Sequence, residues 1–313
     1  MLAFCGYGLA VEWSGVQTTL DRVRWYAVAG SVVAATAGSG AMMMAWRALL
    51  ADLGSPLPVP AAARITFVGQ LGKYVPGALW SFAAHVELAY DRQVPRLRGA
   101  ASVVMALGVA IGVGLVLAAA GLPLASATVA RHYLWIMAAI PVLVACLCPP
   151  VLGWLTDRLL VLIRMPRLAR RPTWGGFAVV VGWTVLGWLM YGLQVWALLA
   201  SVTGLGVGVL LLAVAGYALA CSAALALVVF PGGIGPREVI LIAVLAPVLD
   251  RPGALALALL ARATATISDL AWGAIGLAIG RRAPARPAGS DTVAAASPAG
   301  NGPLLKPGAQ GLL

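Results

Sequence analysis

Long runs of apolar residues, separated by short polar segments, make up most of this chain. A helix needs about 20 residues to cross the hydrocarbon core of a bilayer. The runs therefore predict an all-α, polytopic membrane protein with about 6–8 membrane segments. Six candidate spans cover about residues 25–46, 99–121, 133–151, 175–201, 207–230 and 254–279.

Two polar segments interrupt this pattern, one at residues 69–77 and one at residues 231–238. Proline removes a backbone donor and glycine loosens the chain, so each segment should break a helix. Broken helices at membrane depth are tolerated only where the backbone is buried in protein or lines a polar cavity. Two of them in corresponding halves of a chain are typical of a transport site. The expected helix-breaking residues are Pro76, Gly77, Pro231, Gly232, Gly233 and Gly235.

Charge placement predicts the topology of the second half. The arginine-rich segment 157–171 and the tail from Arg281 onward should be cytoplasmic, and the uncharged segment 201–206 should lie outside. Counting crossings between them requires segment 231–249 to carry the chain outward once more. A helix over residues 236–249 would be about 21 Å long, against a hydrocarbon core of about 30 Å. We therefore expect a half-helix that is entered through an unwound segment.

The first half is less determinate. Basic residues before position 99 place that loop inside, but segment 60–90 can either cross the membrane or dip into it and return. Arg22 and Arg24 weakly favour an inside start, which would require a crossing. The two alternatives stay open.

Composition excludes several classes of protein. The chain is 62% hydrophobic and only 10% charged, which leaves too little polar surface for a soluble globule. The net charge is +11, and the basic residues lie mainly between the apolar runs, as in membrane proteins. We therefore expect no nucleic-acid partner. No arrangement of cysteine, histidine or carboxylate residues fits a metal site, a cofactor or a catalytic centre, so an enzyme is not expected. Residues 1–280 should form one membrane domain, and residues 281–313, rich in alanine, proline and glycine, a disordered and cytoplasmic tail.

Lys73 is the first candidate for ligand binding. It is one of two lysines in the chain and lies within an apolar region. A cation at the centre of a spanning helix costs about 2.5–3.5 kcal/mol, which an anionic ligand would lower. The alternative is a lysine that snorkels to the membrane surface. Gln70 would share its helical face, while Tyr74 and Trp80 are candidates that also fit an aromatic belt.

The second interruption offers a sharper candidate. Pro236 suits the first position of a helix, and Arg237 and Glu238 then lie in its first turn. A helix N-terminus is a natural anion site, and a guanidinium matches phosphate or carboxylate. Glu238 can pair with Arg237 or cap the helix. On the last span, Arg262, Thr266 and Asp269 share one face, where they form either a structural pair or part of a pathway.

Both interruptions together resemble the family of lysylphosphatidylglycerol synthase transmembrane regions. The resemblance is carried by Gly-Gln-Leu-Gly-Lys-Tyr-Val-Pro-Gly at 69–77 followed by Trp80, by Pro-Gly-Gly-Ile-Gly-Pro-Arg-Glu at 231–238, and by Arg262. It covers about residues 13–280, with proline at position 236 as a departure from the usual pattern. It implies re-entrant helices around a lipid-accessible cavity. In well-understood members this domain flips an aminoacylated phospholipid made by a fused synthase domain, which we do not expect in this chain.

The leading hypothesis is a flippase or translocase that moves an anionic phospholipid or a lipid-linked intermediate, such as a polyprenyl phosphate, across the cytoplasmic membrane. Lys73 with Gln70 would meet the phosphate from one half of the chain, and Arg237 from the other. The alternative is a membrane scaffold that does not transport and that anchors a glycosyltransferase or lipid synthase. A membrane-embedded transferase is weaker, because no acid, base or nucleophile set is visible.

Overall fold

The computed structural model describes residues 13–72, 80–125, 134–162, 166, 168, 170–226 and 235–282. Within these ranges every regular element is a helix, and five helices are long and apolar enough to cross a membrane. The protein is therefore a polytopic helical membrane protein, as predicted. The five helices are α3 (Trp25–Asp52), α6 (Arg96–Ala125), α10 (Trp174–Thr203), α11 (Val207–Ala226) and α13 (Arg251–Arg282).

The expected single helix over residues 133–151 is wrong, because this region contains separate helices with a bend between them. A short 3₁₀ helix, η2 (Leu134–Ala139), leads into α8 (Ile140–Leu147), and α9 (Pro149–Leu162) follows with its axis bent by 71°. Cys148 separates α8 from α9 with φ −57° and ψ 138°. Proline disfavours the helical conformation in the residue before it, and its ring clashes with the preceding turn. The consecutive prolines at 149 and 150 therefore bend the segment after Cys148, and at most the two pieces together make a sixth span.

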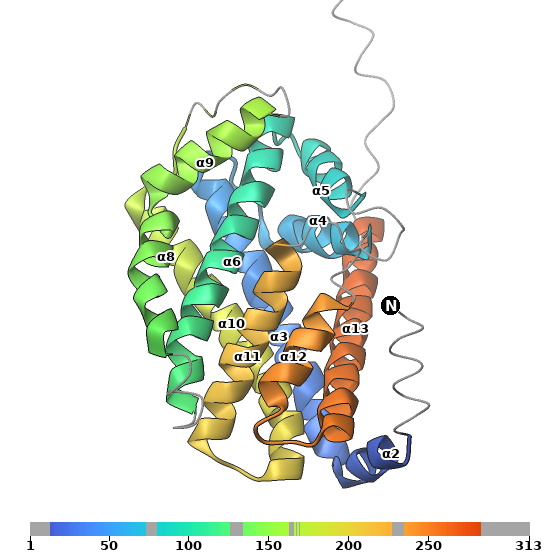
Figure 1. The fold of residues 1–313 in the computed structure, drawn as a ribbon. Coiled ribbons are helices and arrows are strands. Elements are labelled where there is room, and N and C mark those ends of the chain that lie inside the picture. The colour runs from blue at the N-terminus through green and yellow to red at the C-terminus, as the bar shows by residue number, and fades with distance from the viewer. Residues whose placement is uncertain are drawn as a thin grey trace, which may run out of the picture.

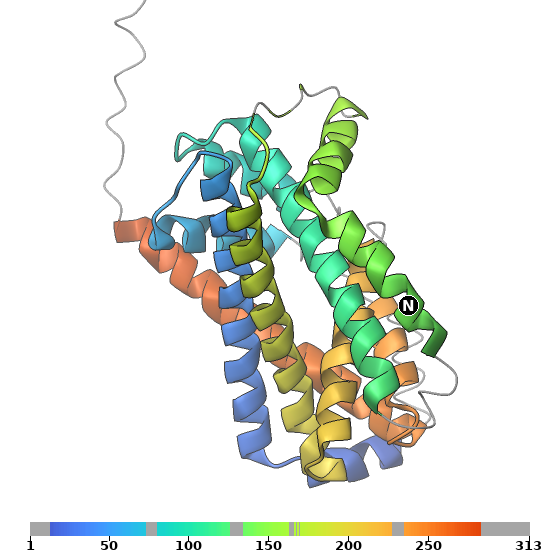
Figure 2. The same ribbon diagram turned by 90° about the vertical axis from the view of Figure 1, so that its left-hand side faces the viewer.

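The long helices pack into one bundle (Figures 1 and 2). Helix α10 packs most closely on α3, and α11 on α6, while α13 crosses beside α3 and α4 (Val59–Leu71). The indole ring of Trp272 on α13 stacks on Phe67 of α4, with 4.2 Å between the ring centroids. Small residues allow close approach between α10 and α11, because a Cβ atom at Gly192 would lie 2.6 Å from Cα of Val214.

Contacts at the helix ends decide the topology of the first half. The Asp52 carboxylate at the end of α3 accepts hydrogen bonds from Thr173, directly before α10, and Arg98 near the start of α6 donates to Gly54. These helix ends therefore lie at the same end of the bundle. Segment 60–90 therefore begins and ends at this end of the bundle, as expected if it dips into the membrane and returns. Helix α2 (Trp13–Arg22) lies at the opposite end (Figure 1), so an inside position for Arg22 and Arg24 and an inside position for the loop before residue 99 cannot both hold.

Each interruption is followed by a short helix. The first lies between α4 and α5 (Trp80–Tyr90), which form a hairpin in which Ser81 Oγ donates to the carbonyl of Gly69 at 3.0 Å. After the second, α12 (Pro236–Leu245) turns back beside α11 (Figure 1). The predicted start at Pro236 is confirmed, and α12 ends at Leu245 instead of residue 249. Its 10 residues span about 15 Å, half of a hydrocarbon core.

Several predictions fall outside the described residues. They concern Pro76 and Gly77 of the first interruption, Pro231, Gly232 and Gly233 of the second, and the tail at 283–313.

Candidate functional site

The start of α12 is built by a glycine and a capping carboxylate. Gly235 has φ +103°, a conformation that favours glycine, and Pro236 takes the first helical position. Glu238 Oε2 accepts a hydrogen bond from the backbone N–H of Gly235 at 2.7 Å. Of the two roles considered for Glu238, the structure therefore shows capping rather than pairing with Arg237.

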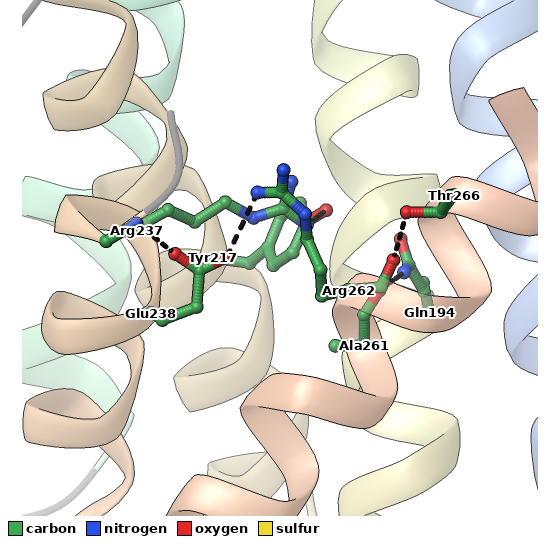
Figure 3. A network of polar contacts seen from close by, with 8 residues as sticks. Gln194, Tyr217, Arg237, Glu238, Ala261, Arg262 and Thr266 are labelled. Carbon is green, nitrogen blue, oxygen red and sulfur yellow. Dashed lines mark hydrogen bonds and ion pairs between the residues drawn. The ribbon is translucent and has the colours of Figure 1, made fainter. Parts of the chain in front are cut away.

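The second carboxylate oxygen of Glu238 joins α12 to α13. Its Oε1 lies 3.1 Å from Nη1 of Arg262, and the side chains are 8% and 23% exposed, respectively. Removing one partner of a buried ion pair costs far more than the pair itself contributes, because a charge is left uncompensated. The pair therefore fixes the first turn of the half-helix against α13 (Figure 3).

Arg237 points toward α11 instead (Figure 3). Its guanidinium donates a hydrogen bond to the hydroxyl of Tyr217 and lies 4.6 Å from the centroid of the tyrosine ring. Within the described ranges, no salt bridge involves Arg237. This half-buried cation thus has a neutral hydrogen-bond partner at the positive end of a helix dipole, and the adjacent carboxylate of Glu238 is bonded to Gly235 and Arg262 instead. Such an arrangement favours an anion.

A polar network continues from this point through the bundle interior. The ring of Tyr217 lies 5.9 Å from that of Tyr191 on α10, whose hydroxyl is 3.0 Å from Ser39 Oγ on α3. One turn further along α10, Gln194 donates to the carbonyl of Ala261 at 2.7 Å and to Thr264 Oγ1 at 3.1 Å, both on α13. Five helices therefore meet through polar side chains.

The network lies at the middle depth of the bundle. Tyr217 is near the centre of α11, Tyr191 near the centre of α10 and Ser39 near the centre of α3. Polar and charged side chains at this depth are costly and normally face the interior of the bundle, where substrate sites of transporters lie. The cluster around Arg237 is therefore the candidate site.

The other predicted residues have different surroundings. Thr266 donates to the carbonyl of Arg262 at 2.9 Å, a bond within its own helix, and Asp269 lies half-buried further along α13. Gln70 is half-buried near the end of α4, which packs on α13, and Trp80 is 59% exposed. The exposure of Trp80 fits the aromatic-belt alternative better than a buried contact. Lys73 and Tyr74 lie outside the described residues.

Sequence reasoning missed Tyr217, Tyr191 and Gln194. Each is a polar side chain inside a predicted span, and this alone is a signal, because such residues rarely face lipid. Their partners on other helices could not be read from the chain. Metal binding finds no support in the described ranges, where no group of three His, Cys, Asp or Glu residues could hold an ion.

Comparison with known proteins agrees with this architecture. The curated proteins contain no match to the chain. A family model described as the lysylphosphatidylglycerol synthase TM region matches residues 2–273, which is most of the sequence. The match includes both interruptions and all of the residues around Arg237. The chain therefore belongs to the family of lysylphosphatidylglycerol synthase transmembrane regions.

Proposed function

We propose that this protein is a flippase or translocase that moves an anionic phospholipid, or another lipid with a phosphate head group, across the cytoplasmic membrane. One observation carries the proposal: Arg237 lies at the start of a half-length helix, at mid-depth, with the neutral Tyr217 as its hydrogen-bond partner. Family membership supports a role in lipid handling.

The head group would be held by two kinds of donor. The guanidinium of Arg237 presents a planar fork that matches two phosphate oxygens. The first turn of α12 adds backbone N–H groups and the positive end of its dipole. Glu238 already caps the N–H of Gly235, so this carboxylate also keeps the helix start in place when no anion is bound.

Movement would use the short helices. Helix α12 is tied to α13 through the Glu238–Arg262 pair, and its start at Gly235 requires a glycine conformation. We expect Lys73, from the first interruption, to meet the same phosphate from the other half of the chain. The lipid tails would stay in the bilayer while the head group passes between the two breaks.

The test is a flipping assay in liposomes. The full chain is reconstituted with a fluorescent phosphatidylglycerol, and dithionite quenching reports lipid that has reached the outer leaflet. Arg237→Gln should lower the flipping rate at least tenfold, while Arg96→Gln, which removes an exposed arginine at one end of the bundle, should leave it unchanged. Normal flipping by a stably expressed Lys73→Ala/Arg237→Ala double variant would refute the proposal.

A second readout identifies the ligand. Mass spectrometry of lipids retained by the purified protein should find one anionic lipid class enriched, and this class should be lost from Arg237→Gln. If wild type and both variants retain the same bulk lipid, and the wild type flips no faster than empty liposomes, the scaffold alternative is favoured.

A further inference from the structure

Gln194 carries a buried acceptor for which the structure shows no donor. Its residue exposure is 0%, and its amide nitrogen donates to the Ala261 carbonyl (Figure 3) and to Thr264 Oγ1. Among the residues that the structure describes, its Oε1 atom has no hydrogen-bond partner. An unpaired polar atom in the interior carries the full cost of lost hydration, so it calls for an explanation.

Flipping the side-chain amide of Gln194 would not give Oε1 a hydrogen-bond donor. Rotation by 180° would place Oε1 against the carbonyl oxygen of Ala261, where two acceptors would face each other. The amide orientation is therefore fixed, and the polar atom of Gln194 that still needs a partner is the acceptor Oε1.

Ser268 carries a second unpaired group nearby in the fold. It follows Thr264 by one turn of α13 and lies on the same helical face, with 1% exposure and no partner for its Oγ within the described ranges. Thr264 cannot serve either residue, because its hydroxyl already accepts from Gln194 and Ser31 and donates to its own helix. Two orphaned groups thus belong to facing helices, α10 and α13.

We propose that a water molecule is bound between α10 and α13 and bridges Gln194 Oε1 to Ser268 Oγ. The water would donate to the amide oxygen and accept from the serine hydroxyl, which satisfies both groups at once. A metal cation is the poorer fit. Gln194, Ser268, Thr264 and Ser31 are neutral, and the amide N–H of Gln194 presents positive charge to the same region.

The bound water has a mechanical consequence. A contact mediated by water can be broken and remade with little loss, because water replaces one hydrogen bond by another. The bridge itself would therefore resist a shift of α13 against α10 less than the direct bonds from Gln194 to Ala261 and Thr264 do. The inference goes beyond the proposed function and holds whether or not the protein moves lipid.

The direction in which Ser268→Ala shifts the melting temperature tests the proposed water bridge. If the site is dry, Ser268→Ala removes an unsatisfied hydroxyl and should raise the melting temperature of the detergent-solubilised full chain. If water bridges the two residues, the same change breaks the bridge and should lower it. We expect a decrease of several degrees, and an increase would overturn the proposal.

A double-mutant cycle adds specificity. In a Gln194→Met background, Ser268→Ala should no longer lower the melting temperature, because the bridge is already lost. Ser222→Ala is the matched control, since Ser222 on α11 is also 0% exposed with an unpaired hydroxyl. Its effect should be the same with and without Gln194→Met. Additive effects of Gln194→Met and Ser268→Ala would refute the bridge, and if Gln194→Met does not fold, the sign for Ser268→Ala decides.

The identity of the ligand is tested by changing the salt. Melting in sodium, potassium and choline chloride at equal ionic strength should give the same temperature for the wild type. A rise that is specific to one metal cation and absent from Ser268→Ala would show a cation in place of water and would overturn the proposal.

Discussion

The ion pair between Glu238 and Arg262 allows a quantitative prediction. Glu238→Ala removes the carboxylate that pairs with the 23% exposed guanidinium of Arg262 across the α12–α13 contact, and it also removes the cap on the N–H of Gly235. Breaking a buried pair from one side costs about 3–5 kcal/mol, and the partial exposure of Arg262 places the cost at the lower end, about 3 kcal/mol. The lost cap adds about 1 kcal/mol.

The expected loss of about 4 kcal/mol corresponds to a fall of about 10 °C in melting temperature for a chain of this size. The assay is thermal denaturation of the detergent-solubilised protein, followed by fluorescence size-exclusion chromatography. Glu238→Gln should fall between wild type and Glu238→Ala, because its amide oxygen still accepts from Gly235 while the charge is lost. The matched control is Glu87→Gln, since Glu87 pairs with Arg96 at the protein surface.

Removal of both charges separates the pair from the cap. The double variant Glu238→Gln/Arg262→Met removes both charges of this pair, and well-packed neutral replacements of buried pairs are often nearly neutral in stability. It should therefore melt closer to wild type than Arg262→Met alone. A Glu238→Ala protein that melts with the wild type, or a double variant that is less stable than both of its single variants, would refute the reasoning.

Two further variants probe the packing and the surface. Gly192→Ala should lower the melting temperature by several degrees, because its Cβ would lie 2.6 Å from backbone Cα of Val214. The control is Gly182→Ala on the same helix, whose Cβ would meet nothing within 4 Å. This variant should melt at or above the wild-type temperature. Hydrogen bonds from Arg96 lower the pKa of Glu87, so this pair stabilises the fold at neutral pH and the contribution is lost as the pH falls through the lowered pKa. Both side chains are at least half exposed, so Glu87→Gln should change the melting temperature at pH 7 by no more than the scatter of scanning fluorimetry, and a large fall would show that the pair matters more than its exposure indicates.

The amino-acid sequence alone was sufficient for the elements whose causes are local. Five of the expected spans are helices, because the length of an apolar run and the bilayer thickness depend on nothing else in the fold. The start of α12 at Pro236 followed from proline at a first helical position after glycine. The length estimate for residues 236–249 also indicated correctly that this helix is too short to span.

The bend after Cys148 shows where a long apolar run misleads. Its composition favoured one span, although the two prolines that follow Cys148 carried the signal for a break. Whether segment 60–90 crosses could not be decided in the same way, because the charge bias of Arg22 and Arg24 was too weak to choose between the two alternatives. Contacts of Asp52 and Arg98 at one end of the bundle decided it.

The site itself was only half accessible from the sequence. Arg237, Glu238 and Arg262 could be singled out because charged residues inside apolar runs are costly wherever they lie. Which of them pair is a different question, since Glu238 and Arg262 are 24 positions apart and meet only because α12 turns back beside α13. The contact of Arg237 with Tyr217 likewise depends on which helices become neighbours. Local pattern sets helices and their ends, whereas partners across helices are set by packing, and packing is a property of the whole bundle.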